Sequence, residues 1–273
     1  MRYRLIHVSD LHAGPPFDPR AAERLAQITH ELAPDLLVIS GDLVQRADFP
    51  NQWWEILACI ATLPQPRLIV PGNHDVPLFN FARRLISPLS IYQHYISPDV
   101  NPVFQRPGLV VAGASSAQGR TVDGGWLGAA QMAALERAFA PHGPATCKVA
   151  VWHHPLVMPP GAARNRTLEN APEAARLLDR LGVDILLCGH LHTTFISSTR
   201  SIMPGLERGT ITCQSGTSSS TRGHGDEHYQ NSFNMIDLDD ETITITTFRA
   251  QNGGPFVHAT THRFVRDANL TPL

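Results

Sequence analysis

The sequence shows no excess of charge of either sign. Its 273 residues include 22 Lys and Arg against 24 Asp and Glu, which gives a formal net charge of -2, and charged residues make up 17% of the chain. Proteins that bind duplex nucleic acid usually carry a clustered basic excess, because they neutralise a line of phosphates. The composition therefore does not indicate a duplex DNA or RNA partner, but it is compatible with a small anionic substrate.

Cysteine is scarce and widely spaced. The chain has four cysteines and no Cys-x-x-Cys pair, at the positions Cys59, Cys147, Cys188 and Cys213. This spacing argues against a thiolate zinc site. Three of the four lie in apolar runs, which favours buried, reduced thiols and a reducing compartment.

Long hydrophobic runs and linkers are missing as well. No stretch approaches the roughly 20 apolar residues of a membrane span, and the first residues are too short and too polar for a secretory signal. We find no linker that would separate two domains, and 42% hydrophobic residues suffice for a substantial core. We therefore expect a cytoplasmic protein without a membrane partner, in which residues 1–273 form a single domain. The sequence leaves open a homo-oligomer.

Short apolar runs alternate with longer helical patterns over most of the chain. The predicted helices span 19–32, 51–61, 128–140 and 171–181, with Asp18 and Asn51 as N-caps of the first two. The predicted strands span 3–8, 36–40, 67–70, 109–114, 147–152, 184–188, 210–214, 233–238, 242–249 and 257–264. Short connections suggest antiparallel pairing of the last three. Residues 77–107 give no clear assignment. The pattern indicates a mixed, two-layer sheet core with helices outside.

Polar motifs follow five of these apolar strands. They are Asp10-Leu11-His12, Gly41-Asp42, Gly72-Asn73-His74-Asp75, His153-His154-Pro155 and Gly189-His190-Leu191-His192. Each motif is weak alone, because a polar pair after a strand is usually a turn or a cap. Ligands collect at the carboxyl ends of strands in α/β sheets. Five such ends in one sheet would bring the motifs together.

The motifs supply oxygen and nitrogen ligands and no thiolate, which suits manganese, iron or zinc rather than soft-metal centres. Seven side chains are available: Asp10, His12, Asp42, Asn73, His153, His190 and His192. One ion with an open position needs only three or four. Seven therefore imply two ions that share a carboxylate, and two adjacent ions can clamp a phosphoryl group and generate hydroxide at neutral pH.

As a set, the motifs resemble those of the calcineurin-like metallophosphoesterase superfamily, in order from Asp10 to His192. The resemblance implies an α/β fold, a four-layer αββα sandwich with two mixed β-sheets flanked by helices and a dinuclear metal site at strand carboxyl ends. The implied ligands are Asp10, His12 and His192 for the first ion, Asn73, His153 and His190 for the second, and Asp42 for both. A water or hydroxide between the ions would attack phosphorus.

The resemblance gives His74 a catalytic role beside the phosphate, where it would stabilise charge or protonate the leaving oxygen. The chain departs from the family at one position: many members have an Asp three residues after the bridging Asp, and here that residue is Gln45. Without that charge the protonated form of His74 is less favoured. In those members the Asp hydrogen-bonds the catalytic His, and here Asp75 or Asp48 could make that contact with His74.

Three further residues are candidates for substrate binding. Arg222 and His224 lie in a glycine- and hydroxyl-rich segment, 215–228, which reads equally well as a substrate loop or as a surface connection. Arg suits the oxygens of a phosphate. His154 follows a ligand directly and would point the other way, toward substrate or into packing.

The expected function is hydrolysis of a small phosphodiester. Spacing and length look like the cyclic nucleotide and glycerophosphodiester phosphodiesterase branch, which makes a 3′,5′-cyclic nucleotide or a glycerophosphodiester the candidate substrate. The alternatives are a phosphomonoesterase, a nucleotide-sugar or lipid pyrophosphatase, and a non-catalytic interaction module. The last is disfavoured because all seven ligand positions are filled.

Overall fold

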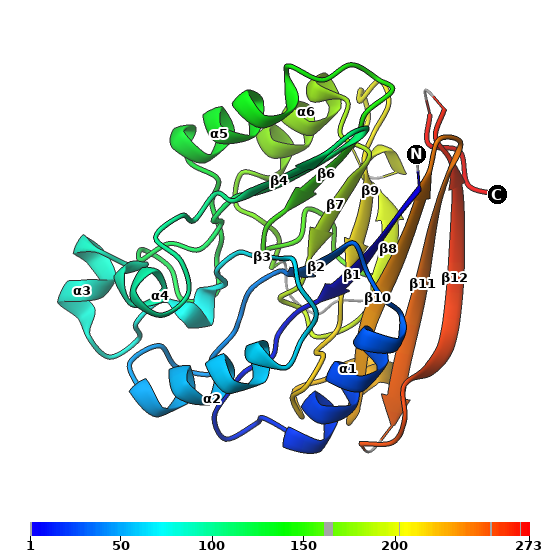
Figure 1. The fold of residues 1–273 in the computed structure, drawn as a ribbon. Coiled ribbons are helices and arrows are strands. Elements are labelled where there is room, and N and C mark those ends of the chain that lie inside the picture. The colour runs from blue at the N-terminus through cyan, green and yellow to red at the C-terminus, as the bar shows by residue number, and fades with distance from the viewer. Residues whose placement is uncertain (1, 161–165, 202, 252, 268) are drawn as a thin grey trace.

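The computed structural model describes residues 2–160, 166–201, 203–251, 253–267 and 269–273. Two six-stranded sheets lie at its centre (Figure 1). The strands of the first are β1 (Arg2–Val8), β2 (Leu36–Ile39), β3 (Arg67–Ile69), β10 (Gln230–Asp239), β11 (Thr242–Gln251) and β12 (Val257–Val265). Their order across the sheet is β12-β11-β10-β1-β2-β3. β1, β2 and β3 are parallel, and the antiparallel pairing of β10, β11 and β12 confirms the prediction from their short connections.

The second sheet is also mixed. Its strands are β4 (Val103–Arg106), β5 (Leu109–Gly113), β6 (Cys147–Val151), β7 (Ile185–Cys188), β8 (Phe195–Ser198) and β9 (Ile211–Gln214). They run in the order β4-β5-β6-β7-β9-β8. The four inner strands are parallel, and the edge strands β4 and β8 pair antiparallel.

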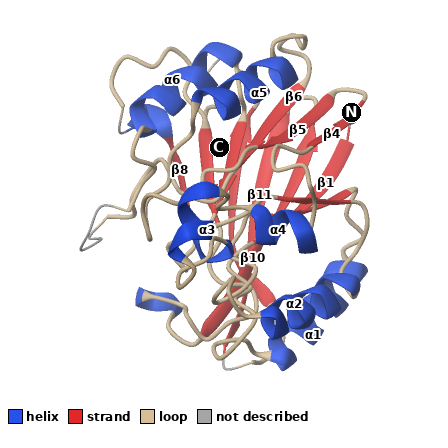
Figure 2. Ribbon diagram, turned by 90° about the vertical axis from the view of Figure 1, so that its left-hand side faces the viewer, coloured by secondary structure: helices blue, strands red, loops and turns tan. Residues whose placement is uncertain are grey.

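Helices cover the outer faces of both sheets (Figure 1). α1 (Pro19–Glu31) and α2 (Pro50–Ala61) lie outside the first sheet, and α5 (Ala129–Phe139) and α6 (Ala171–Leu181) lie outside the second. Two short helices, α3 (Phe81–Ile86) and α4 (Ser90–Tyr95), face the viewer in Figure 2. The single turns of 3-10 helix are η1 (Asn73–Asp75), η2 (Thr199–Ser201) and η3 (Gly225–Glu227). No helix in the described part of the chain has the length and apolar character needed to cross a membrane.

The alternation of side chains along the strands builds four layers. Leu5 packs with Val149 in a buried cluster between the two sheets. The next residue, Ile6, points the other way and packs with Ile56 of α2. Ala150, the neighbour of Val149, likewise packs beneath α5 and α6. Because successive side chains of a strand face opposite sides, each sheet has one inner and one helix-covered face, which confirms the αββα sandwich.

The five motif-bearing strands do not belong to one sheet, contrary to the simplest reading of the sequence. β1, β2 and β3 end in the first sheet, whereas β6 and β7 end in the second. All five are short and largely buried apolar runs, so periodicity cannot tell which sheet each one joins.

The N-caps of α1 and α2 and the strand β8 test the predictions made from local sequence. Asp18 caps α1 as predicted, and its Oδ1 accepts from the N–H of Arg20 at 2.9 Å. Asn51 is not a cap: α2 begins at Pro50, whose fixed φ suits the first helical position, with Phe49 as N-cap. β8 was not predicted, since its four residues are only partly buried.

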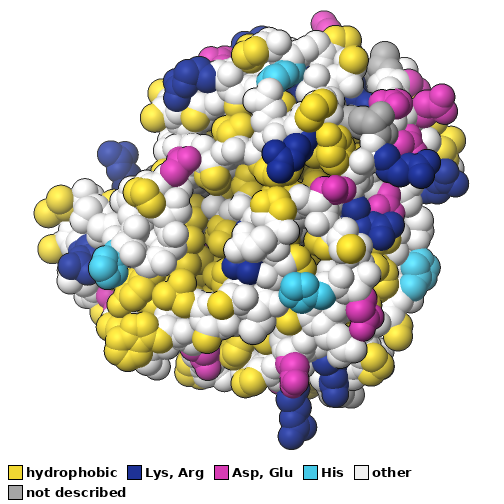
Figure 3. Space-filling model, in the orientation of Figure 1, with side chains coloured by type: hydrophobic (Ala, Val, Ile, Leu, Met, Phe, Trp, Pro, Cys, Tyr) yellow, Lys and Arg dark blue, Asp and Glu magenta, His cyan; other side chains and the backbone are white. Residues whose placement is uncertain are grey.

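The aromatic residues of 77–107 have two different environments. Tyr92 is fully buried, and Tyr95 stacks on Trp53 with ring centroids 5.3 Å apart. Phe79 and Phe81 are 65% and 68% exposed. Figure 3 shows hydrophobic side chains gathered on the side of the molecule where α2, α3 and α4 lie.

Candidate metal centre

Side chains from five loops converge where the loops of the two sheets meet. They are Asp10 and His12 after β1, Asp42 after β2, Asn73 after β3, His153 after β6, and His190 and His192 after β7. Each of them is at most 5% exposed. The structure thus brings together all seven residues that the sequence singled out.

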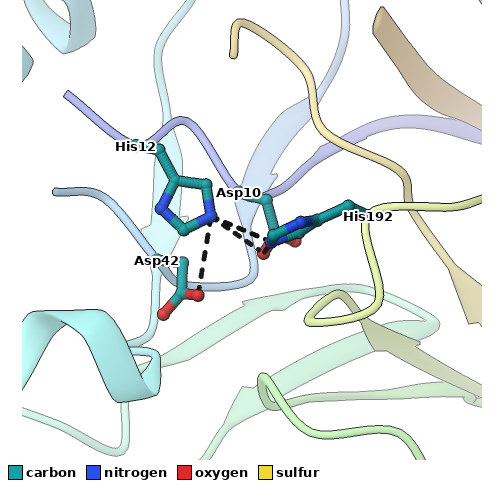
Figure 4. Close-up of side chains that lie close together, drawn as sticks. All are labelled: Asp10, His12, Asp42 and His192. Carbon is teal, nitrogen blue, oxygen red and sulfur yellow. Dashed lines mark hydrogen bonds and ion pairs between the residues drawn. The ribbon is translucent and has the colours of Figure 1, made fainter. Parts of the chain in front are cut away.

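The first cluster contains Asp10, His12, Asp42 and His192, with one ligand atom of each within 4.8 Å of the others (Figure 4). The Nε2 atoms of His12 and His192 are 3.0 Å apart. Nε2 of His192 lies 3.2 Å from Asp10 Oδ1, and Nε2 of His12 lies 3.7 Å from Asp42 Oδ2. Ligands bound at about 2.0–2.2 Å to one ion stand roughly 3–4 Å apart. These separations therefore fit a single cation.

The second cluster contains Asp42, His153 and His190. Nε2 of His153 is 3.2 Å from Asp42 Oδ2. Asn73 joins this group, because its Oδ1 is 3.0 Å from Nδ1 of His190. Asp42 belongs to both clusters, so the arrangement is that of a dinuclear metal site with one shared carboxylate.

Hydrogen bonds outside the clusters turn the imidazoles toward the site. Nδ1 of His153 lies 2.8 Å from the carbonyl oxygen of Ser40, and Nδ1 of His192 lies 3.0 Å from that of Arg222. A proton on each Nδ1 leaves Nε2 with its lone pair, as a metal ligand requires. Nε2 of His153 and Oδ1 of Asp10 are buried with no hydrogen-bond partner among the described residues. Such orphaned atoms fit the donor set of bound cations.

Electrostatics favour ionised carboxylates at the centre. Burial opposes ionisation of Asp10, but the imidazoles of His192 and His12 hold the pKa of its carboxyl well below the usual range. Burial lowers the pKa of His12 and His190 to about 3, so both rings are neutral ligands. Burial also disfavours charge on His153, yet the carboxylates of Asp42 and Asp10 outweigh it and raise its pKa to about 9. Metal binding must therefore displace a proton from His153.

The ligand loops have a strained backbone. Five ligands have left-handed φ values between 50° and 77°, namely Asp10, His12, Asp42, His190 and His192. A non-glycine residue in this conformation costs about 1–2 kcal/mol. Backbone hydrogen bonds between the loops oppose the strain, such as that from the N–H of His12 to the carbonyl of Asp42 at 3.0 Å. Strain concentrated at one site is typical of functional loops.

Two glycines permit the close approach of these loops. A Cβ at Gly72 would collide with the side chain of Asp42, and a Cβ at Gly189 would collide with Ser9 and Asp10. Both glycines precede a candidate ligand. Their role is therefore to let neighbouring ligand loops touch.

His74 lies beside the first cluster and outside the ligand sets. The backbone N–H of His74 donates to Asp42 Oδ1 at 2.8 Å. The ring of His74 stands edge-on to the ring of His12, with centroids 4.8 Å apart. Nδ1 lies 2.8 Å from the carbonyl oxygen of Gln45 and 2.9 Å from Nη1 of Arg46. Nε2 lies 3.3 Å from Nη1 of Arg222. We call Gln45, Arg46, His74 and Arg222 the rim.

The expectation that Asp75 or Asp48 contacts His74 is wrong. Asp75 accepts from the N–H groups of Gly72 and Leu43 at 2.8 and 2.9 Å, so it ties two ligand loops together. Asp48 accepts from backbone N–H groups of the segment 78–80. Both carboxylates are therefore occupied by backbone donors, and the guanidiniums of Arg46 and Arg222 lie beside the His74 ring instead.

Sequence reasoning missed Arg46. It lies next to Gln45, and its Nη1 also donates to the carbonyl of Gln45 at 2.7 Å. The pKa of His74 is lowered, mainly by burial of the ring and further by the guanidiniums of Arg222 and Arg46. The carboxylate of Asp42 acts in the opposite direction and raises it. The basic residue directly after the unusual Gln45 was the signal available in the sequence.

The three candidate substrate residues all lie near the clusters. Nη1 of Arg222 donates to Oε1 of Gln45 at 2.8 Å. The exposed ring of His224 stacks on His192 with centroids 5.2 Å apart, which places 215–228 beside the site. His154 is buried, and its ring centroid lies 4.6 Å from that of His190. Nδ1 of His154 lies 2.8 Å from Oγ of Ser116.

Comparisons with known proteins agree with this geometry. The profile of the calcineurin-like phosphoesterase family matches residues 3–194. The fold is similar to that of purple acid phosphatase PPD1 from yellow lupin, with a TM-score of 0.70 and 13% identity over 96% of this chain and 53% of that one. It is also similar to a dimetal phosphatase from Danio rerio, with a TM-score of 0.67 and 13% identity over 94% of this chain and 98% of that one.

The present chain thus spans about half the length of the lupin enzyme, and at such low identity these likenesses show the fold alone. No match to the chain was found among curated proteins. The family profile covers the segment that carries all seven candidate ligands, Asp42 among them. The chain therefore belongs to the calcineurin-like phosphoesterase family of metal-dependent phosphoric ester hydrolases.

Proposed function

We propose that the chain hydrolyses a small phosphodiester at the dinuclear centre. The observation that carries this proposal is the pair of buried ligand clusters that share Asp42 and lie beside His74. Bound cations would supply Lewis acidity and a water of lowered pKa. The ligands would be Asp10, His12 and His192 for one ion, Asn73, His153 and His190 for the other, and Asp42 for both.

In this proposal His74 stabilises charge at the reacting phosphate. With the proton on Nδ1, that N–H donates to the carbonyl of Gln45 and Nε2 accepts from Arg222. Arg46 then donates to the same carbonyl. His74 thereby orients the guanidinium of Arg222, a permanent donor, toward the phosphate oxygens. Transfer of a proton to the leaving oxygen is less favoured, because the neighbouring guanidiniums disfavour a charged ring.

Two cavities that both border the rim support a diester. The smaller, of about 150 Å³, is lined by residues that include Asn73, His74 and Val122. The larger, of about 540 Å³, is lined by residues that include Pro16 and Phe49. Both are also lined by Arg46 and Arg222. A phosphate held there has room for two substituents, as in a 3′,5′-cyclic nucleotide or a glycerophosphodiester.

A metal-reconstituted activity panel tests the proposal. Protein loaded with manganese, iron or zinc would be assayed on bis(p-nitrophenyl) phosphate and p-nitrophenyl phosphate, then on cyclic AMP and glycerophosphodiesters. We expect the diester to be preferred. Preference for the monoester would instead identify a phosphomonoesterase, and inactivity on all four with both metal positions filled would contradict the proposal.

Further features of the proposal rest on separate observations. Residues 1–273 would act as one domain, since β10, β11 and β12 extend the sheet that begins with β1. Four free, buried cysteines are compatible with a reducing, cytoplasmic location. His154 and His224 are proposed to shape the site around the substrate, given their ring contacts with His190 and His192. The choice of metal and self-association stay predictions.

A further inference from the structure

The two guanidiniums of the rim have no acidic partner in the described part of the chain. Arg46 donates through Nη1 to the carbonyl of Gln45 and Arg222 donates through Nη1 to the amide oxygen of the same residue. Both side chains are only partly exposed. A guanidinium offers five N–H donors, so most donors of each remain available to a ligand.

The imidazole of His74 separates the two guanidiniums. Nη1 of Arg46 lies 2.9 Å from its Nδ1, and Nη1 of Arg222 lies 3.3 Å from its Nε2. Nε2 faces Arg222, whose backbone carbonyl oxygen lies 3.0 Å from Nδ1 of the candidate ligand His192. Arg222 therefore stands nearer the ligand clusters, and Arg46 stands on the far side of the ring.

The local charge balance calls for an anion of more than one charge. The pKa of Arg222 is lowered, mainly by burial and further by the guanidiniums of Arg46 and Arg166. The carboxylates of Asp42 and Asp10 raise it but do not offset the lowering. With two cations bound, the positive charges would outnumber the carboxylates of Asp10 and Asp42. A simple phosphodiester carries a single negative charge, which leaves much of this excess uncompensated.

From this arrangement we infer that the substrate carries a second phosphate group, held by Arg46, next to the phosphate that reacts beside Arg222. The second group would occupy the 540 Å³ cavity, whose lining includes Arg46, Arg222 and Thr221. A planar guanidinium binds phosphate oxygens in pairs, which gives both strength and orientation. This inference rests on the proposed function and narrows it to diesters with an adjacent phosphate, such as those with a phosphoanhydride link.

Two stable anions that differ only by one phosphonate group provide the test. Methylphosphonate and methylenediphosphonate would be titrated calorimetrically into the manganese-loaded protein, with manganese in excess and metal content measured. We expect the diphosphonate to bind at least about tenfold more tightly to the native protein. In Arg46→Gln this preference should fall below about threefold, and Arg46→Lys should recover part of it because charge returns without the planar fork.

Arg176→Gln is the matched control, because Arg176 is exposed on α6 away from the rim. Its preference for the diphosphonate should equal that of the native protein. A preference that survives intact in Arg46→Gln, or that is absent from the native protein, would overturn the inference. Hydrolysis of bis(p-nitrophenyl) phosphate reports separately on the proposed function, so a failure of either claim can be told from a failure of the other.

Discussion

The metal centre and the rim lie side by side but compensate their charges in opposite ways. At the centre, the carboxylates of Asp10 and Asp42 are held ionised beside the neutral ring of His12 and the ring of His153, whose proton a bound cation would replace. At the rim, the guanidiniums of Arg46 and Arg222 face an imidazole and an amide. One region therefore lacks positive charge and the other lacks negative charge. The comparison indicates that cations complete the first region and an anionic substrate completes the second.

Removing the shared carboxylate should have the largest effect. Asp42→Asn deprives both clusters of their common ligand and leaves the contact from the N–H of His74 weakened. We expect turnover of bis(p-nitrophenyl) phosphate to fall at least about a thousandfold, because neither cation position keeps its full ligand set. Metal content measured by mass spectrometry should fall as well.

Asp99→Asn serves as its control, since Asp99 is exposed and caps only a local turn. Full metal content and appreciable turnover in Asp42→Asn would refute a dinuclear centre built on this residue.

His74→Ala separates the rim from the centre. The ring is absent from both ligand clusters, so metal content should stay at its native level. Turnover should fall about a hundredfold, which is typical of one lost polar group at a reacting phosphate. Loss of a cation in this variant would show that the division between centre and rim is misplaced.

The ligands could be predicted from sequence, whereas the assembly of the rim could not. The sequence singles out Gln45, His74 and Arg222 one by one, but neither Arg46 nor the contacts among the four residues. Each ligand stands in a short motif directly after an apolar strand, so the residue type and its place on the chain carry the signal. Their left-handed φ values and their origin in two sheets are tertiary consequences that no local pattern contains. Arg46 and Arg222 meet across a separation of about two thirds of the chain, and only the fold brings them to the same imidazole.

The metal-free centre should lose stability as pH rises. The pKa of His153 is raised from 6.5 to about 9, so its protonated form stabilises the folded metal-free protein fully below pH 6.5, and this contribution disappears as pH rises through 9. Chemical denaturation of the chelated protein should show a free energy of unfolding lower by about 2–3 kcal/mol at pH 9.5 than at pH 6.5. His153→Gln should remove most of that difference, and equal pH slopes in the two proteins would contradict the assignment.

Gln45→Asp should have the smallest effect on turnover, and it tests the charge of the rim directly. Oε1 of Gln45 accepts from Arg222 at 2.8 Å, so a carboxylate there would pair with a guanidinium that now lacks an acid. The added charge lies near His74 and favours its protonated form, so the pH at which activity appears on the acidic side should rise, because the neutral ring is the one that accepts from Arg222. Turnover of a simple diester should change by less than about tenfold, because no metal ligand is touched. Tighter binding of methylenediphosphonate in this variant would be incompatible with a rim that attracts anions, since the new carboxylate competes for the same guanidinium.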